Sequence, residues 1–485
     1  MFSADRLFET KAPLLPFLCC LIAGIAIGNS LSVYPSSFLL YSLFAVLVAL
    51  TLISGKKPQL QSILIYGCTV MLGLFLTIRA TLRSDRLIDT EERLMEGVVA
   101  SEPAEKDKTM AVQVVLCESG ETVNCYLWKD ERSRSLTPGD GLRMKVRMEE
   151  GWHHTLRCYV SARKWQKNNI ALKRLSLIDR TRIRFLKWRH SLLERYRLQG
   201  ASDDAYAVLA AMTLGDKSAL SKELKDTYSI TGASHVLALS GLHLSIVYLL
   251  LTGLTFTRRR RRVWSQALVV LSIWSFALLV GLPVSVVRSA LMISIFALFS
   301  LGERPHLSIN LLCLAACIIL LINPFSLFDV GFQLSFVAVL SILLFMPLFQ
   351  PEGALSTQRS RFSSLFLRPI YSCLAVSLAA QIGSAPIVAF YFGRFSTYFL
   401  LTNLVVLPAA YLILCGTLMM LLIPAASTAV IWIVNLLNNL LTYITKLPMA
   451  SIEGLHPSVV QVALYYILVA SLYGITYILT SARHR

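Results

Sequence analysis

Long apolar runs alternate with short polar segments over most of this 485-residue chain, and this pattern predicts a bundle of membrane-spanning helices. A helix of about 20 apolar residues crosses a bilayer core, and runs of this length lie on both sides of one long polar region. We predict twelve spans, at 14–30, 37–54, 60–80, 232–256, 263–282, 284–301, 307–323, 328–348, 370–392, 397–422, 426–446 and 459–480. The two spans from 397 to 446 are the weakest, because one contains Pro408 and the other three asparagines, so either is expected to be broken or interfacial.

The polar region at 83–200 contains short runs in which apolar and polar residues alternate, as they do in β-strands. Turn signals such as Pro138-Gly139-Asp140 separate these runs. The runs are Val98–Val99, Val112–Leu116, Thr122–Trp128, Gly141–Val146 and Leu156–Ala162. Five short strands favour a small barrel or sandwich, with an OB-fold as the leading candidate.

Basic residues in the loops set the expected orientation. Lys56 and Lys57 follow the second span, and an arginine cluster follows the fourth, so both loops are expected in the cytosol. Both termini are then cytosolic, and the polar region is extracytoplasmic. We therefore expect three parts: 1–82 with three spans, 83–200 as a small all-β domain with a basic helical tail, and 201–485 as the main transmembrane domain.

Composition agrees with a polytopic α-helical membrane protein, since 55% of the residues are hydrophobic and only 15% are charged. The net charge of +18 has an ordinary cause in positive cytosolic loops. One segment, 157–197, is nevertheless strongly basic, with aromatic residues interleaved. It is either a strip that binds phosphates while aromatic rings stack on bases, or a helix that lies on anionic headgroups. The candidate DNA-binding residues are Trp128, Lys129, Arg163, Lys164, Trp165 and Lys167.

Three of the ten cysteines lie in the polar region. Cys117 and Cys125 flank a Ser-Gly turn and are expected to face each other across a hairpin, or one of them to pair with Cys158. No C-x-x-C pair or other zinc spacing occurs in the sequence, so no metal or other cofactor is expected.

Four polar clusters lie inside apolar runs, where polar side chains are costly and usually face a cavity or a partner. A helix would place His235, Ser240 and His243 of the first cluster within an arc of about 140°. In the third cluster, Asp329 and Gln333 are four residues apart and are expected to share a helical face. In the fourth cluster, glycine and Pro386 are expected to unwind the helix. The candidate path residues from the four clusters are His235, Ser240, Gly241 and His243; Arg288; Asp329, Gln333 and Ser335; and Gln381.

Each cluster also has a purely structural interpretation. Arg288 and Asp329 can form a buried ion pair that touches no substrate, and asparagines can join helices. His235 can be a satisfied interfacial histidine. Together, an arginine and two histidines near the outer side suit an anionic polymer better than a cation.

The stretch from Ser234 to His243, S-H-V-L-A-L-S-G-L-H, closely resembles the H-L-L-A-I-S-G-L-H signature of the ComEC family of competence DNA channels. Further family-like stretches occur at 214–221, 281–292, 323–336 and 381–386, in the order in which the family has them. The resemblance implies a channel of the inner membrane that passes one DNA strand to the cytosol during natural transformation. It also implies that seven of the nine candidate path residues, all except Ser335 and Gln381, shape the channel, and that a periplasmic protein delivers the DNA.

One feature departs from many members of that family, which carry a metallo-β-lactamase-like domain. No H-x-H-x-D-H motif occurs in the sequence, and His153-His154 does not match it. We therefore expect a transport protein without nuclease activity, with strand degradation supplied by a separate nuclease. Because the sequence contains no Walker A motif, a separate ATPase or the proton gradient is expected to drive movement.

Two other functions stay open. Ala238-Leu-Ser240-Gly241 is similar to the G-x-S-G of intramembrane serine proteases, although its first glycine is replaced and a base on another helix is missing from the sequence pattern. A transporter of another anionic substrate is the second alternative, and the basic polar region argues weakly against it.

Overall fold

The structure is a computed structural model that divides into two compact units. Unit 1 holds Met1–Leu220, Leu237–Phe332 and Ile413–Ile431, and unit 2 holds Ser221–Val236, Gln333–Leu412 and Trp432–Arg485. The residues that the structure describes are 12–31, 37–85, 92–150, 156–170, 172–201, 203–254, 262–301, 309–349 and 367–483.

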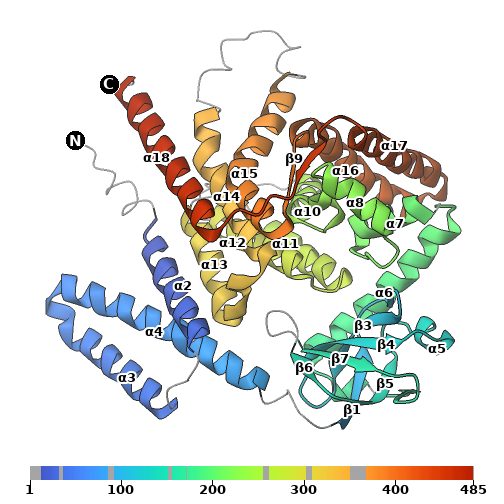
Figure 1. Ribbon diagram of the computed structural model, residues 1–485, viewed down its shortest axis with the longest axis horizontal. Helices are drawn as coiled ribbons and strands as arrows, with labels where there is room; N and C mark the ends of the chain where they lie inside the picture. Colours follow the sequence, from blue (N-terminus) through green and yellow to red (C-terminus); the bar gives the residue numbers. More distant parts are fainter. Residues whose placement is uncertain are drawn as a thin grey trace. The chain divides into compact units, whose positions relative to one another are not determined.

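Unit 1 begins with three apolar helices, α2 (Leu15–Ser30), α3 (Ser37–Ile53) and α4 (Pro58–Asp85) (Figure 1). Small residues allow α2 and α4 to pack backbone against backbone. A Cβ atom at Gly73 would lie 2.6 Å from the Leu21 carbonyl oxygen, so no larger residue fits at this position without a backbone shift. Such close approach through small residues is typical of helix pairs in membranes.

The polar region of unit 1 folds into one eight-stranded sheet (Figure 1). Its strand order is β6-β7-β4-β3-β1-β5-β8, with β2 paired to β3. Neighbours are antiparallel except β4 and β7, which run parallel. The bounds are β1 Arg93–Val99, β2 Ala104–Glu105, β3 Thr109–Leu116, β4 Thr122–Trp128, β5 Gly141–Val146, β6 Glu149–Glu150, β7 Leu156–Val160 and β8 Trp165–Asn168. Each of the five predicted runs coincides with a strand, although the run at 156–162 extends two residues beyond β7, and β2, β6 and β8 are additional.

Alternation of the side chains builds the core of this sheet. In β4, Val123, Cys125 and Leu127 are buried, whereas the residues between them point outward. Helix α6 (Leu177–Leu198) covers a second apolar cluster, because its Ile183 and Leu186 pack with buried residues of β1 and β3. The basic amphipathic helix predicted for this segment is therefore a packed connecting helix, with most of its basic side chains on the exposed face.

The remaining helices of unit 1 follow α6 along the chain. Helix α7 is short and buried on almost every side. Helix α12 contacts α10, α11 and α13, and these four helices form an apolar group. Their bounds are α7 Asp203–Leu214, α10 Gly241–Leu254, α11 Arg262–Leu279, α12 Val284–Leu301 and α13 Ile309–Ile322, followed by the 3₁₀ helix η5 (Pro324–Phe328).

Unit 2 contains mostly long helices and a two-stranded sheet, in which β9 (Arg394–Ser396) pairs antiparallel with β10 (Ser451–Glu453). Gly393, with φ at 63°, ends the helix before β9 in the left-handed conformation that favours glycine. The helices that lie wholly or partly in this unit are α8 Lys222–Ile230, α9 Ser234–Leu237, α14 Val330–Phe349, α15 Arg368–Phe392, α16 Phe399–Leu422, α17 Ser427–Thr445 and α18 Val459–Arg483.

The protein is a polytopic helical membrane protein. Six helices in the described part of the chain are long and apolar enough to cross a membrane, and seven shorter apolar helices accompany them. A helix lies within each of the twelve predicted spans, but how many of them cross a membrane stays a prediction. The helices at 399–422 and 427–445 are each continuous, so the expected interruption at Pro408 is wrong.

One predicted span is not a single helix. The chain at 232–256 forms the short helix α9, leaves helical geometry at Ala238–Ser240 and resumes as α10. The common arc predicted for His235, Ser240 and His243 is therefore wrong. His235 belongs to unit 2, and the other two residues belong to unit 1.

Candidate functional site

The break before α10 places a serine and a histidine in contact. Ser240 precedes the first residue of α10, and His243 lies in its first turn and is fully buried. The hydroxyl of Ser240 lies 3.2 Å from His243 Nδ1, and the Ser240 N–H donates to the same nitrogen at 3.3 Å. This geometry resembles a capping box, with histidine in the position that glutamate or glutamine usually takes.

Helix α12 joins this break to the second polar cluster. The hydroxyl of Ser285 donates to the Leu239 carbonyl oxygen at 2.8 Å. One turn later, the Ser289 hydroxyl lies 3.1 Å from the point that a Cβ atom on Gly241 would occupy. Glycine at 241 thus allows α10 to begin directly against α12.

The same helix reaches the third cluster through Arg288. Its Nη1 lies 3.4 Å from Oδ1 of Asp329, and the arginine is only 4% exposed. Asp329 has an extended backbone and precedes α14, where its Oδ1 accepts the Phe332 N–H at 2.7 Å. Asp329 therefore caps α14 instead of lying on a helical face with Gln333, as predicted.

Three of the four clusters are thus connected within unit 1. Ser240, Gly241, His243, Arg288 and Asp329 form one continuous series of contacts through α12, which we call the polar seam. The seam lies among apolar helices, where each unsatisfied polar group is costly. Sequence reasoning missed Ser285, although it lies in the second cluster, because a single serine carries no distinctive signal.

The other candidate path residues lie in unit 2. His235 Nδ1 lies 3.1 Å from the Gly232 carbonyl oxygen, which fits the interfacial interpretation of this residue. Gln333 and Ser335 lie in α14, and Gln381 lies in α15; all three are half-buried. These four residues therefore stand outside the seam as it is defined in unit 1.

The fourth cluster does not unwind its helix, so that prediction is wrong. Helix α15 continues through Pro386, which lacks an N–H to donate to the Ile382 carbonyl four residues earlier. The Tyr465 hydroxyl supplies a replacement donor to this carbonyl at 3.0 Å, and Tyr466 donates to the Gly383 carbonyl at 2.7 Å. Helix α18 therefore satisfies the backbone groups that proline disturbs in α15.

The outward face of the sheet carries stacked aromatic rings. Tyr126 of β4 and Tyr159 of β7 are register partners, and their rings stack with centroids 5.0 Å apart. The Lys106 ammonium lies over the Tyr126 ring at 4.7 Å. Trp128, 55% exposed, lies two residues further along β4 on the same face. We call these four residues the aromatic platform. Strand alternation places both tyrosines on this face, but neither is among the predicted DNA-binding residues.

The predicted DNA-binding residues divide into different environments. Trp128 lies on the platform and Arg163 is exposed, but Trp165 is 2% exposed and belongs to the sheet core. Trp165 therefore has no ring face open to a base, contrary to prediction; its inward position in β8 explains the burial. The three predicted lysines are ion-paired: Lys129 with Glu105, Lys164 with Glu92 and Lys167 with Asp140.

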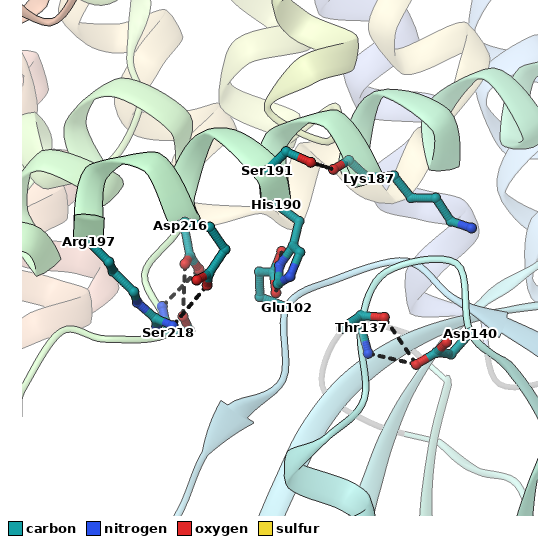
Figure 2. A network of polar contacts seen from close by, with 10 residues as sticks. Glu102, Thr137, Asp140, Lys187, His190, Ser191, Arg197, Asp216 and Ser218 are labelled. Carbon is teal, nitrogen blue, oxygen red and sulfur yellow. Dashed lines mark hydrogen bonds and ion pairs between the residues drawn. The ribbon is translucent and has the colours of Figure 1, made fainter. Parts of the chain in front are cut away.

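A polar junction joins the sheet region to α6 (Figure 2). His190 of α6 faces Glu102 from the loop after β1, with Nδ1 at 3.1 and 3.2 Å from the two carboxylate oxygens. Burial raises the pKa of the Glu102 carboxyl, although the charges of His190 and Arg189 oppose this shift. Arg189 is buried beside His190 and donates to the Val280 carbonyl oxygen at 3.2 Å. The junction thus connects the sheet, α6 and the loop that precedes α12.

The three cysteines of the sheet region have a definite arrangement. Cys125 and Cys158 are register partners on parallel strands, and their sulfur atoms are 3.1 Å apart. The β4 residue Cys125 lies opposite Val112 of β3, so the expected Cys117–Cys125 hairpin pair is wrong. Cys117 is half-buried and follows the end of β3.

No group of three or more histidine, cysteine, aspartate or glutamate side chains gathers in the described ranges in a way that could hold a metal ion. The pair His153-His154 and arginines 258–261 of the cluster expected in the cytosol lie outside those ranges.

Comparison with known proteins gives the family. The family model described as "Competence protein" matches residues 212–477. ComE operon protein 3 of Bacillus subtilis is 29% identical over 279 residues, which are 55% of this chain and 34% of that protein. Competence protein ComA of Neisseria gonorrhoeae is 29% identical over 168 residues, 32% of this chain and 24% of that protein.

An uncharacterized Escherichia coli protein, YcaI, is 26% identical over 212 residues, 42% of this chain and 27% of that protein. The matched segments thus cover well under half of these three relatives. No solved structure matches the chain. The polar seam and the family match lie in the same part of the sequence. The family model covers more than half of the chain, so the chain belongs to the competence protein family. This is the ComEC family, whose signature the stretch from Ser234 to His243 resembles.

Proposed function

We propose that this protein is a channel of the cell inner membrane that passes single-stranded DNA into the cytosol during natural transformation. The polar seam is the observation that carries the proposal. It connects three clusters of costly polar groups, one of which includes a nearly buried arginine, inside a bundle of apolar helices. Membership in the competence family supports a role in DNA uptake.

The aromatic platform is the proposed first contact with DNA. The pairing of five strands, β7-β4-β3-β1-β5 with β4 and β7 parallel, supports an OB-like fold. In OB-folds, the face of the second and third strands binds oligonucleotides, and here these strands are β3 and β4. The Tyr126–Tyr159 stack and Lys106 supply ring faces and a cation for unpaired bases and phosphates.

This function requires a particular topology. We propose that both termini are cytosolic and that the domain at 83–200 is extracytoplasmic, between the first three spans and the channel domain at 201–485. DNA then meets the platform before it meets the seam. A periplasmic DNA-delivery protein, a separate ATPase and a separate nuclease are the proposed partners, and this chain is proposed to transport DNA without hydrolysing it.

Uptake of labelled DNA tests the proposal. A strain that lacks this gene is complemented with the wild type or with His243→Ala, Arg288→Ala or Asp329→Ala, and the amount of each protein in the membrane is measured. The expected result is that labelled DNA still binds to the cells but does not reach the cytosol when a seam residue is replaced. Wild-type delivery by all three variants at equal protein level would contradict the proposal.

One observation favours a second function. The 3.2 Å distance from the Ser240 hydroxyl to His243 Nδ1 is within the range for a nucleophile and its base in a serine hydrolase. The same nitrogen also accepts the Ser240 backbone N–H, which fits a helix cap at least as well. A fluorophosphonate probe that labels the wild type and not Ser240→Ala would support hydrolysis, and absence of labelling on the folded wild type would exclude it.

A further inference from the structure

Arg288 has hydrogen-bonding capacity that the protein does not use. A guanidinium carries five N–H donors, and among the described residues this one makes a single hydrogen bond, the 3.4 Å contact from Nη1 to Asp329. Its Nε is buried and has no hydrogen-bond partner in the described part of the chain. A buried donor without an acceptor is unfavourable, so an acceptor brought by a ligand would stabilise this guanidinium.

The acceptor that faces Arg288 is also shared. Asp329 Oδ1 accepts the Phe332 N–H at 2.7 Å, so the arginine is left with a long contact to an oxygen that is already engaged. Arginine and carboxylate groups that form a stable pair usually meet through two short, parallel hydrogen bonds. The Asp329 side chain is 47% exposed, whereas that of Arg288 is only 5% exposed. The carboxylate therefore has room to move away from the guanidinium.

The guanidinium lies against the first turn of α14. A Cβ atom at Gly331 would be 3.1 Å from Arg288 Nη2 and 2.9 Å from Asp329 Oδ1. Glycine at this position leaves the space between the arginine and the helix open. The N-terminus of a 20-residue helix also presents backbone N–H groups and the positive end of the helix dipole. Two positive groups thus face one place, and an anion between them stabilises both.

We propose that this place is a binding site for a phosphate group and that Asp329 is its resident substitute. A phosphodiester oxygen of the passing strand takes the position of the Asp329 carboxylate between Arg288 and the first turn of α14. When the phosphate moves on, the carboxylate returns, so that no single phosphate is held tightly. The assignment of the anion to nucleic acid rests on the proposed function, whereas the anion site itself does not.

Asp329→Asn is the decisive variant. Asparagine is as good a helix cap as aspartate, so the acceptor for the Phe332 N–H is retained while the competing charge is removed. The full-length protein, purified in detergent, is titrated with a fluorescent oligothymidine. The expected result is binding about tenfold tighter than in the wild type, with a slower release of the oligonucleotide. Unchanged or weaker binding by a variant with wild-type melting temperature would overturn the proposal.

Arg288→Lys is the partner variant, because it keeps the charge and removes the planar fork. Binding several-fold weaker than in the wild type is expected, and equal binding would count against the site. A methylphosphonate oligothymidine, which has an uncharged backbone, is expected to bind all three proteins equally. A response of this oligomer to Asp329→Asn would also overturn the proposal, since no phosphate charge is then involved.

Two further experiments distinguish failure of the anion site from failure of the proposed DNA-uptake function. The titrations are repeated with Tyr126→Ala and Tyr159→Ala in the background, so that binding at the aromatic platform does not mask the seam. Inorganic phosphate, measured by its effect on the melting temperature, is expected to stabilise Asp329→Asn more than the wild type. If phosphate does so in a protein that proves dispensable for DNA uptake, the anion site stands and the proposed function fails; if it does not, the site fails.

Discussion

The hydroxyl of Ser285, on α12, donates to the carbonyl oxygen of Leu239 at 2.8 Å, directly where the chain leaves helical geometry before α10. This bond satisfies a backbone acceptor at the break and joins two of the polar clusters. Without it, the Leu239 carbonyl would lie among apolar side chains, because Leu239 is 2% exposed.

Replacing Ser285 with alanine is therefore expected to destabilise the protein by about 1 kcal/mol, since a buried acceptor loses its donor. Thermal unfolding of the purified protein in detergent measures this change. Ser272→Ala is the matched control, because Ser272 on α11 is also half-buried and its hydroxyl donates to the Leu268 carbonyl of its own helix. An equal loss of stability in both variants would show that the hydrogen bond to Leu239 contributes no more than an ordinary bond within a helix.

The aromatic platform predicts a preference for unpaired DNA. Tyr126→Ala and Tyr159→Ala are each expected to weaken binding of single-stranded DNA by about 1–3 kcal/mol, since each removes a ring on which a base can stack. Fluorescence anisotropy of the full-length protein with a labelled oligonucleotide measures the loss. Trp188→Ala is the control, because Trp188 is an exposed aromatic residue of α6 and lies outside the platform. An equally large loss of DNA binding in Trp188→Ala would show that the aromatic platform is not a specific binding site.

The two buried sheet thiols predict a covalent link in an oxidising compartment. Cys125 and Cys158 face each other across parallel strands, so a disulfide is expected between them in protein taken from cells. A maleimide–polyethylene glycol mass shift on the unfolded protein, with and without prior reduction, measures it. Cys125→Ser and Cys158→Ser are expected to abolish the reductant-dependent shift, and Cys117→Ser to retain it. Loss of the shift in Cys117→Ser would contradict the geometry.

The junction of Glu102 and His190 predicts a pH dependence of stability. Because burial raises the pKa of Glu102, the folded state holds this proton more tightly than the unfolded state. The contribution of Glu102 is therefore greatest below the ordinary glutamate pKa, and it is lost as pH rises through the raised value. The melting temperature of the wild type minus that of Glu102→Gln is expected to fall as the pH rises above the ordinary glutamate pKa of about 4.3. A difference that is constant or rises with pH would contradict the shift.

Much of the fold follows from the sequence pattern. The apolar runs predicted helices in every expected span, and alternation predicted the five main strands. The strand β8 was missed because only four residues form it, and its one buried residue, Trp165, resembles a surface aromatic in a basic segment. Burial of that ring is decided by pairing with β5, a non-local contact that no short pattern reveals.

Part of the polar seam was predicted from the sequence, because polar residues are rare in apolar helices and therefore conspicuous. Polar residues at membrane depth drew attention to Ser240, Arg288 and Asp329, and the structure connects all three. The break at Ala238–Ser240 was not predictable, because serine and glycine are tolerated inside membrane helices as well as at their ends. Pro386 was expected to unwind α15, but Tyr465 satisfies the carbonyl that proline leaves without a donor. Such compensation by another helix is invisible in local sequence.

The most direct test of the central claim asks whether transported DNA touches the polar seam. Ser240→Cys places a thiol on the seam, and Ser289→Cys places one beside the seam residue Gly241, both with little change in size. Ser272→Cys places a thiol on the side of α11 that carries the exposed Leu268. Cells that express each variant take up DNA carrying iodoacetyl groups on its backbone, and covalent protein–DNA adducts are counted above the level given by the native cysteines. Protein–DNA adducts are expected in the variants at positions 240 and 289, and none is expected in the variant at position 272. Adducts at 272 alone, or none at the seam while DNA still reaches the cytosol, would contradict it.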